Sequence, residues 1–313
     1  MKIKKPLFWD NKKPNLISYL MLPFTFPVII NNFLLSQKVR HKKNQAIKTI
    51  CLGNIYIGGT GKTPLVIKLN KILTKLNYKT AVIKKFYKNQ GDEQKILKSK
   101  TNFYCEKKRM KALDKANNDK NEIALFDDGL QDKSISYDLS FVCFNDLKGL
   151  GNGFLIPAGP LRENANSLIK YDGAFINGNN DDNTTLKKVL KIYNPNIEIF
   201  ETCYVPQNMN KISVEEKYLV FSGIGNPDSF KKTLSQNNLN IVHEIKFPDH
   251  YQYKDNDIKK IKFLARQLGA KIITTEKDYV KIEKGDQNEI LFLSIDLLIK
   301  NEDKLISFIK SKI

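Results

Sequence analysis

Apolar and polar residues alternate along the chain in blocks of strand and helix length. Short apolar runs predict buried strands, and the first of them is followed by a glycine-rich loop and by apolar residues at helical spacing over 63–77. The predicted strands of this part are 44–54, 79–86, 121–131, 137–145 and 171–178. Because strand, loop, helix and strand follow one another, we predict an α/β domain with a doubly wound parallel sheet.

The same alternation restarts beyond about residue 205. Strands are predicted at 217–225, 240–247, 270–276 and 289–296, and helices at 227–238 and 254–269. We therefore predict a first domain over 41–205 and a second, smaller α/β domain over 206–313.

The N-terminus carries an uncharged apolar stretch, Leu16 to Leu35, with basic residues on both sides. Spanning a bilayer takes about 20 apolar residues, and Pro23 and Pro27 weaken this stretch as a spanning helix. A buried core helix is one alternative, and a secretory signal peptide is another, although a clear small-residue cleavage site is missing. We favour a membrane-associated segment, residues 1–40, whose kinked hydrophobic helix lies in or dips into an anionic membrane face.

The formal net charge of +19 favours anionic partners, which include nucleic acid, anionic lipid and phosphorylated substrates. Nearly all of the excess is lysine, so a generally solvated surface explains the charge equally well. The four cysteines show no C-x-x-C spacing and only three histidines occur. This composition argues against a zinc site or a disulfide framework and fits a reducing compartment.

The stretch Gly53 to Pro64, GNIYIGGTGKTP, is a candidate phosphate-binding loop because it lies between a predicted buried strand and a predicted helix. It departs from the usual template at Tyr56, where a glycine is expected. Lys62 would reach the β- and γ-phosphates, and Thr63 would place its hydroxyl on Mg²⁺. The predicted nucleotide-binding residues of the loop are Gly58, Gly59, Thr60, Gly61, Lys62 and Thr63.

Acidic residues follow two of the predicted strands. Asp127 and Asp128 end an apolar run, which is the position of a metal-binding carboxylate, although a turn or helix cap is the alternative. Asp92 follows the next strand after the loop, and the carboxyl ends of parallel strands converge on one crevice. It is a candidate for the group that accepts a substrate hydroxyl proton, or else a surface acid. Asp249 and His250 form a further pair in which the histidine could orient a carboxylate.

Together these motifs resemble those of the tetraacyldisaccharide 4′-kinase family, the lipid A 4′-kinases. They occur in family order over nearly the whole chain. The matching stretches are GN at 53–54, GGTGKTP at 58–64, GDE at 91–93, DDGLQ at 127–131, GNG at 151–153, PAGPLRE at 157–163, SGIGNP at 222–227, FPDH at 247–250 and TEKD at 275–278.

The resemblance implies ATP-dependent phosphorylation of the 4′-hydroxyl of a tetraacylated glucosamine disaccharide 1-phosphate. It also implies two α/β/α domains with the active site in the cleft between them. Asp92 is then the base, paired with His250, and Lys62 acts on the phosphates. The other residues that the resemblance places in the site are Thr63, Asp127 and Asp128 at nucleotide and Mg²⁺, and Gln131, Arg162 and Glu163 beside the nucleotide.

This chain departs from the family pattern before Asp92. The family usually has an S-R-G-Y-G-like stretch and a longer spacer, whereas this chain has Lys84 and Lys85, keeps Tyr87 and nearly lacks the spacer. Leu130, Asp132 and Asn164 are milder departures from the family's usual phenylalanine, histidine and proline. We therefore expect an altered loop around Asp92.

An ATPase of the deviant Walker group, acting on DNA or a membrane surface, is the alternative function. Those proteins carry a signature lysine before the paired glycines, where this chain has Ile57. A nucleotide-binding membrane adaptor without catalysis is a third possibility. For the kinase we expect the cytoplasmic face of the inner membrane as the location, an anionic membrane surface and the lipid disaccharide 1-phosphate as partners, no nucleic acid, and no obligate protein partner.

Overall fold

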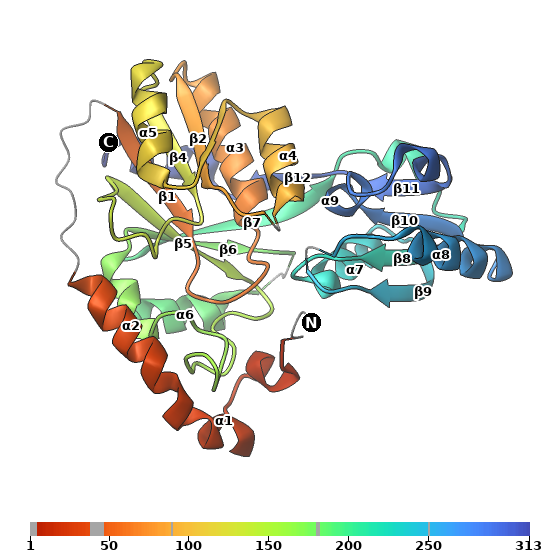
Figure 1. Ribbon diagram of the computed structural model, residues 1–313, viewed down its shortest axis with the longest axis horizontal. Helices are drawn as coiled ribbons and strands as arrows, with labels where there is room; N and C mark the ends of the chain where they lie inside the picture. The colour runs from red at the N-terminus through yellow and green to blue at the C-terminus, as the bar shows by residue number, and fades with distance from the viewer. Residues whose placement is uncertain (1–4, 38–46, 89, 180–181, 250) are drawn as a thin grey trace.

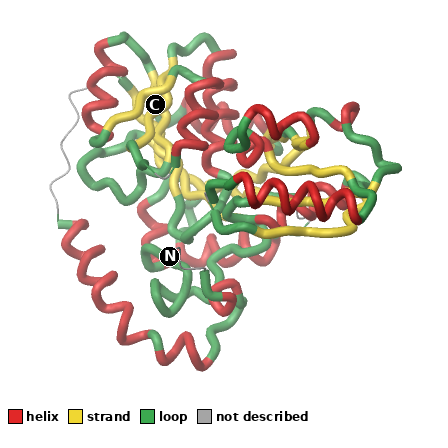
Figure 2. The backbone as a smooth tube through the Cα atoms, turned by 45° about the vertical axis from the view of Figure 1, so that its right-hand side comes forward, coloured by secondary structure: helices red, strands yellow, loops and turns green. Residues whose placement is uncertain are grey.

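The chain forms two α/β units side by side, with an N-terminal helical segment packed on the larger one (Figure 1). The structure is a computed structural model that describes residues 5–37, 47–88, 90–179, 182–249 and 251–313. Strands occupy the centre of each unit and helices lie outside them (Figure 2). The predicted fold class is therefore confirmed.

The larger unit is built on an eight-stranded sheet. In sheet order its strands are β12 (Ile295–Ile299), β7 (Glu198–Pro206), β6 (Gly173–Asn177), β5 (Leu139–Asn145), β1 (Lys48–Gly53), β4 (Ile123–Asp127), β2 (Thr80–Lys85) and β3 (Phe103–Glu106). Every pairing is parallel except that of β12 with β7, which is antiparallel. The central strands are apolar on both faces because helices cover both faces.

Two apolar clusters form the core of this unit, one on each face of the sheet. The first cluster joins β1, β4 and β5 to α5 (Arg109–Asn118), α6 (Thr184–Tyr193) and the 3₁₀ helix Ala165–Lys170. The second cluster joins the sheet to α3 (Lys62–Lys75), α4 (Gly91–Lys100) and α10 (Glu302–Lys310). Helix α3 therefore lies on the sheet at the point where β1 ends, which places the phosphate loop at the carboxyl edge of the sheet.

The smaller unit has a four-stranded parallel sheet of its own. In sheet order its strands are β11 (Ile290–Leu293), β10 (Lys271–Thr275), β8 (Lys217–Ser222) and β9 (Asn240–Lys246). Helix α7 (Pro227–Gln236) packs with one apolar cluster, and α8 (Asp255–Gln267) with the other. A short helix, α9 (Glu276–Tyr279), and a 3₁₀ turn (Lys284–Glu289) follow β10.

The predicted boundary of the second domain is wrong at its C-terminal end. The chain leaves the smaller sheet after β11, and β12 pairs with β7 of the larger sheet. Helix α10 then buries Leu305 and Ile309 in the core of the larger unit. The interval 206–313 thus holds both the smaller unit and the last strand and helix of the larger one.

The N-terminal segment is bent, as its prolines predict. The 3₁₀ turn Leu7–Asp10 comes first, followed by α1 (Leu16–Leu20), a second 3₁₀ turn (Leu22–Thr25) and α2 (Phe26–Ser36). In the described part of the chain, each helix is too short to cross a bilayer.

Polar contacts fasten this segment to the larger unit. Trp9 Nε1 donates to the carbonyl oxygen of Pro157 at 2.9 Å, and Asn152 donates to Ser18 Oγ at 3.0 Å. The side chain of Asn32 donates to the backbone carbonyl of Arg162 at 2.8 Å.

Candidate functional site

The phosphate loop joins β1 to α3 and has the backbone that its glycines predict. Gly58 and Gly61 adopt φ angles of 107° and 77°, a region in which glycine is favoured over residues with a side chain. Asn54 donates to Thr60 Oγ1 at 3.1 Å, and Asn177 donates to the carbonyl oxygen of Thr60 at 2.6 Å. The loop is thus held open in front of the N-terminus of a 14-residue helix, where backbone N–H groups bind anions.

Tyr56, the departure from the phosphate-loop template, has a structural role. Its side chain is buried, and its hydroxyl hydrogen-bonds Asp10 and Lys5 of the N-terminal segment. Its backbone forms a bridge with Leu161, and the next residue, Ile57, donates to the carbonyl oxygen of Pro160 at 2.9 Å. Tyr56 therefore anchors the first half of the loop to the rest of the larger unit.

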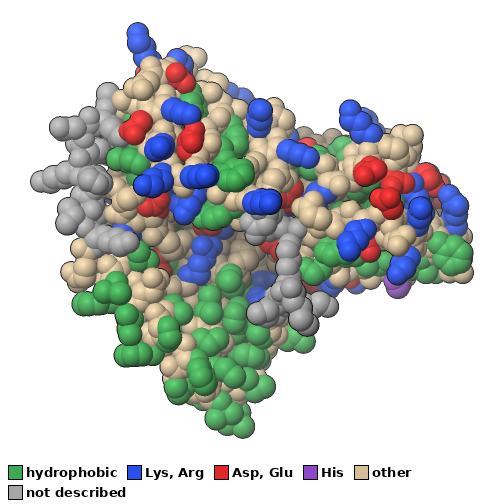
Figure 3. All heavy atoms as spheres, in the orientation of Figure 1, with side chains coloured by type: hydrophobic (Ala, Val, Ile, Leu, Met, Phe, Trp, Pro, Cys, Tyr) green, Lys and Arg blue, Asp and Glu red, His purple; other side chains and the backbone are tan. Residues whose placement is uncertain are grey.

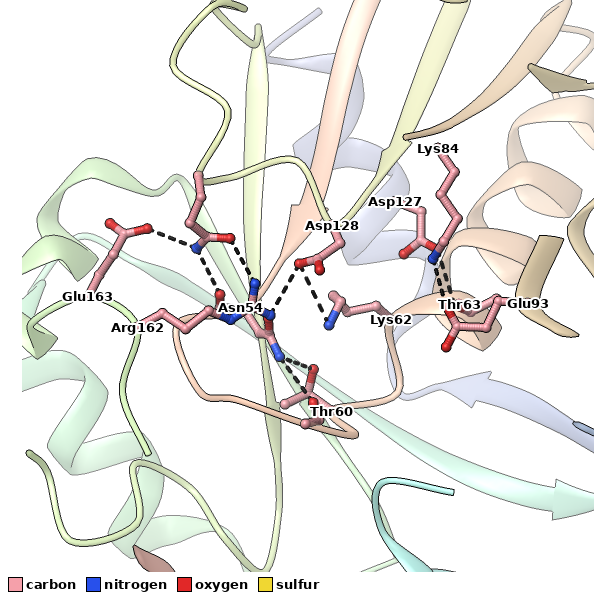
Figure 4. Close-up of polar contacts among 12 residues, drawn as sticks. Asn54, Thr60, Lys62, Thr63, Lys84, Glu93, Asp127, Asp128, Arg162 and Glu163 are labelled. Atoms are coloured by element: carbon pink, nitrogen blue, oxygen red, sulfur yellow. Dashed lines mark hydrogen bonds and ion pairs between the residues drawn. The ribbon is translucent and has the colours of Figure 1, made fainter. Parts of the chain in front are cut away.

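Asp127 lies at the end of β4 and is fully buried beside the start of α3 (Figure 4). Thr63 Oγ1 donates to Asp127 Oδ2 at 3.1 Å, and Lys84 Nζ lies 2.6 Å from the same oxygen. Lys84 Nζ is also 2.6 Å from Glu93 Oε2. Burial acts to lower the pKa of Lys84, but the two carboxylates outweigh it and raise that pKa above its ordinary value. Lys84 is therefore a buried cation.

Asp128 faces the phosphate loop from the next position. Its Oδ1 lies 3.7 Å from Lys62 Nζ and 3.4 Å from Arg162 Nη2 (Figure 4). Burial alone would raise the pKa of Asp128, but the nearby cations Lys62, Arg162 and Lys84 lower it to about 2. The carboxylate is consequently ionised throughout the neutral pH range.

A hydrogen-bonded row holds Arg162 beside the loop. Gln131 accepts from Arg162 Nη1 at 3.2 Å and donates to Glu163 Oε1 at 2.8 Å and to the carbonyl oxygen of Asn54 at 3.0 Å. Arg162 also donates to the side chain of Asn54. The predicted residues Gln131, Arg162 and Glu163 therefore form one connected group.

Asp92 is the second residue of α4 and is 4% exposed. Two lysines of the smaller unit approach its Oδ2 atom, Lys277 Nζ at 3.7 Å and Lys281 Nζ at 3.4 Å. Lys277 also pairs with Glu93 at 3.1 Å and with Asp249 at 3.4 Å. Burial acts to lower the pKa of Lys277, but Glu93, Asp249 and Asp92 raise it above its ordinary value.

Two lysines of the site, Lys277 and Lys84, have no role that the sequence alone predicts. Lys277 belongs to the TEKD stretch, which was a motif without a function, and Lys84 was only a departure from a family pattern. Lysine is abundant in this chain, so neither residue stood out. His250 lies outside the described residues, and its pairing with Asp92 stays a prediction.

A cleft of about 580 Å³ lies between the two units. On one side it is lined by the phosphate loop, Glu93 and Arg162, and on the other by Ile224–Asn226, Asp249 and Lys277. The two units are in close contact at Gly59 and Gly225, where a Cβ atom on Gly225 would lie 2.5 Å from the backbone nitrogen of Gly59. This contact between backbones leaves no room for a side chain on either loop.

We expect Gly225→Ala to weaken nucleotide binding about tenfold. The added methyl group would clash with the backbone of Gly59 and push the two loops apart, and overpacking of this kind costs ~1–3 kcal/mol. The measurement is ATP affinity by isothermal titration. Gly285→Ala is the matched control, since a Cβ atom there meets no heavy atom within 4 Å. Unchanged ATP affinity in Gly225→Ala would contradict the close contact.

Comparison with known proteins agrees with this geometry. The sequence profile of the tetraacyldisaccharide-1-P 4′-kinase family matches residues 16–313. The tetraacyldisaccharide 4′-kinase of Pelagibacter ubique (strain HTCC1062) is 48% identical over 306 residues, covering 97% of this chain and 96% of that protein. The enzyme of the same name from Rickettsia canadensis (strain McKiel) is 35% identical over 326 residues, with coverage of 97% and 96%.

A solved structure shares the fold. The crystal structure described as the "apo" form of LpxK from Aquifex aeolicus in complex with ATP superposes with a TM-score of 0.68 at 22% identity, covering 95% of this chain and 99% of that one. The matches in sequence and in fold both extend over nearly the full chain. This chain therefore belongs to the tetraacyldisaccharide-1-P 4′-kinase family.

Proposed function

We propose that this protein transfers the γ-phosphoryl group of ATP to the 4′-hydroxyl of tetraacyldisaccharide 1-phosphate. The observation that carries the proposal is the cleft itself. A phosphate loop with Lys62 and Thr63 forms one wall, and helix α4, which carries Asp92 in its first turn, stands beside it. The family match supports the same reaction and argues against the alternatives of a DNA-directed ATPase and a non-catalytic adaptor.

The phosphate loop supplies the positive environment for the triphosphate. Backbone N–H groups at the start of α3 and the ammonium group of Lys62 hold the β- and γ-phosphates. Arg162, oriented by Gln131 and Asn54, offers its planar guanidinium to a phosphate oxygen. These groups stabilise the charge that the transferred phosphoryl carries in the transition state.

The residues at the end of β4 fit a magnesium ion. Asp127 Oδ1 is buried and, in the part of the chain that the structure describes, has no hydrogen-bond partner. Thr63 Oγ1 lies next to the same carboxylate, and a hydroxyl and a carboxylate are oxygen ligands of the kind Mg²⁺ prefers. Thr63 and Asp127 would hold the ion, with Asp128 nearby, and the ion would neutralise charge on the β- and γ-phosphates.

Asp92 is the proposed acceptor of the hydroxyl proton. It is next to Glu93 and 3.7 Å from Lys277, both of which line the cleft, and we propose that the sugar hydroxyl reaches it from there. An ionised carboxylate in this position removes the proton as the new P–O bond forms. His250 is proposed to orient it.

The test of the function is an assay with ATP, Mg²⁺ and tetraacyldisaccharide 1-phosphate, monitored for a bisphosphorylated lipid. We expect the product to form only when all three are present. ATP hydrolysis stimulated by DNA without a bisphosphorylated lipid would favour the ATPase instead, and nucleotide binding without either activity would favour the adaptor.

We further propose that the N-terminal segment docks the enzyme on the cytoplasmic face of the inner membrane. Hydrophobic side chains gather over α1 and α2 at one end of the molecule (Figure 3). The most exposed of them are Leu16, Leu20, Phe24, Phe26 and Phe33, each more than 60% exposed. A contiguous apolar surface of this kind marks an interaction site, and the exposed Lys12 and Lys13 beside it suit anionic head groups.

The triple variant Leu20→Ser, Phe24→Ser, Leu34→Ser should bind membranes at least about a thousandfold more weakly, because each side chain contributes ~1.5–3 kcal/mol when buried. The measurement is flotation with vesicles of phosphatidylethanolamine and phosphatidylglycerol. The control variant, Ile192→Ser, Val214→Ser, Phe263→Ser, removes equally exposed apolar side chains elsewhere and should float like the wild type. Equal flotation of both variants would refute the docking surface.

A further inference from the structure

Lys84 occupies an unusual place for a lysine. It lies near the end of β2, directly opposite Asp127 in the parallel pairing of β2 with β4, and is 2% exposed. Its amino group lies between two carboxylates, 2.6 Å from Asp127 Oδ2 and 2.6 Å from Glu93 Oε2 (Figure 4). One carboxylate belongs to the sheet beside the phosphate loop, and the other to the first turn of α4.

The ion pairs continue from Glu93 into the smaller unit. Glu93 Oε1 pairs with Lys277 at 3.1 Å, and Lys277 in turn lies 3.7 Å from Asp92 Oδ2. Positive and negative groups thus alternate from Asp127 to Asp92, and Glu93 uses one oxygen for each lysine. Lys84 is the member of this series that connects the sheet to α4.

A buried ion pair is poor evidence for added stability, since removing charges from water costs about as much as their attraction returns. Its best-attested use is to fix which groups face one another. Here the segment between β2 and α4 has only five residues, 86 to 90, and the longer spacer of the family pattern is nearly absent. The ion pair of Lys84 with Glu93 can therefore orient α4, and with it Asp92, relative to the sheet.

We propose that Lys84 is a positioning residue for the phosphoryl transfer: it fixes the first turn of α4, and with it Asp92, relative to Asp127 and Thr63. This inference rests on the proposed function, in which Asp92 and the phosphate loop act on the same substrates. Lys84 lies in the stretch that departs from the family's S-R-G-Y-G-like pattern, so this contact is one that the family pattern does not predict.

The experiment compares Lys84→Met, Glu93→Gln and the double variant with the wild type. We expect Lys84→Met to lower kcat about 10- to 100-fold, as a displacement of about 1 Å at a reacting group does, while the affinity for ATP stays within about twofold. Glu93→Gln should lower kcat similarly. Because Lys84 acts on α4 through Glu93, the double variant should be no worse than the worse single variant, within about twofold.

Lys262→Met is the matched control. Lys262 also bridges two carboxylates, Asp286 at 2.8 Å and Glu289 at 3.0 Å, but in the smaller unit and away from the cleft. This variant should keep the wild-type kcat. Wild-type kcat in a folded Lys84→Met protein, or losses that multiply in the double variant, would overturn the proposal. If Lys84→Met does not fold, Glu93→Gln decides, and wild-type kcat in that variant overturns it too.

Hydrogen–deuterium exchange supplies a readout that does not depend on activity. Lys84→Met and Glu93→Gln should each increase exchange in the first turn of α4, whereas Lys262→Met should not. Unchanged exchange in α4 would count against the positioning role. If the wild type makes no bisphosphorylated lipid, the proposed function fails, and the exchange result still shows whether Lys84 orders the helix.

Discussion

Replacing Asp92 by alanine should lower kcat about 10²- to 10⁴-fold, the range found when a general base is removed. The affinity for ATP should change by less than about twofold, because Asp92 does not belong to the group formed by the phosphate loop, Asp128 and Arg162. The measurements are the initial rate of bisphosphorylated lipid formation and ATP binding by titration calorimetry.

The companion variant Asp92→Asn keeps the shape of the side chain and removes its charge. It should lose as much activity as Asp92→Ala, because an amide cannot accept the proton. Asp286→Asn, in the smaller unit and paired with Lys262, should retain full activity. A kcat of Asp92→Asn close to that of the wild type would exclude Asp92 as the base.

Replacing Asp127 by asparagine should lower the free energy of unfolding by roughly 3 kcal/mol or more, the cost of breaking a buried ion pair by removing one partner. Asp127 is fully buried and is one of only two carboxylates, among the described residues, that contact the buried Lys84. The concentration of Mg²⁺ needed for half-maximal activity should also rise about 10- to 100-fold. Urea denaturation and a Mg²⁺ titration of the rate measure the two effects.

Asp128→Asn is the matched comparison for Asp127→Asn. Asp128 is partly exposed, and asparagine tolerates its φ of 59°. Its ion pairs are longer, at 3.4 and 3.7 Å, and partly exposed to solvent, so this variant should lose less stability than Asp127→Asn. If both substitutions lower the free energy of unfolding equally, the ion pair of Asp127 with Lys84 contributes no more to stability than the ion pairs of Asp128.

The strands that sequence patterns could predict are the ones that helices cover on both faces. β1, β4 and β5 are largely apolar and buried at nearly every position, and their positions were predicted. β3 and β7 were not, because β3 is half-buried throughout, β7 mixes buried, half-buried and exposed positions, and both carry glutamate and tyrosine. The run 289–296 was predicted as one strand, although the chain changes sheets within it. No glycine or proline marks that change.

The site shows a similar division. The sequence pattern predicted the positions of Lys62, Thr63, Asp127 and Asp128. A glycine loop between a strand and a helix is typical of phosphate binding, and its lysine, its hydroxyl and nearby strand-end carboxylates have known roles in such sites. The ion pairs of Lys84 and Lys277 were not, since each depends on the packing of α4 and α9 against the phosphate-loop region. Lys84 pairs with Asp127, 43 residues away, and Lys277 pairs with Glu93, 184 residues away, and a single lysine carries no pattern.

The contacts of the N-terminal segment have a practical consequence for handling the enzyme. Asp10 holds the buried Tyr56 of the phosphate loop, and Asn32 holds the backbone of Arg162. A water-soluble variant is therefore better made by replacing the outward-facing leucines and phenylalanines than by deleting the segment. A protein redesigned in this way, with Asp10 and Asn32 kept, should bind ATP normally in the absence of detergent and should phosphorylate a short-chain, water-dispersible acceptor.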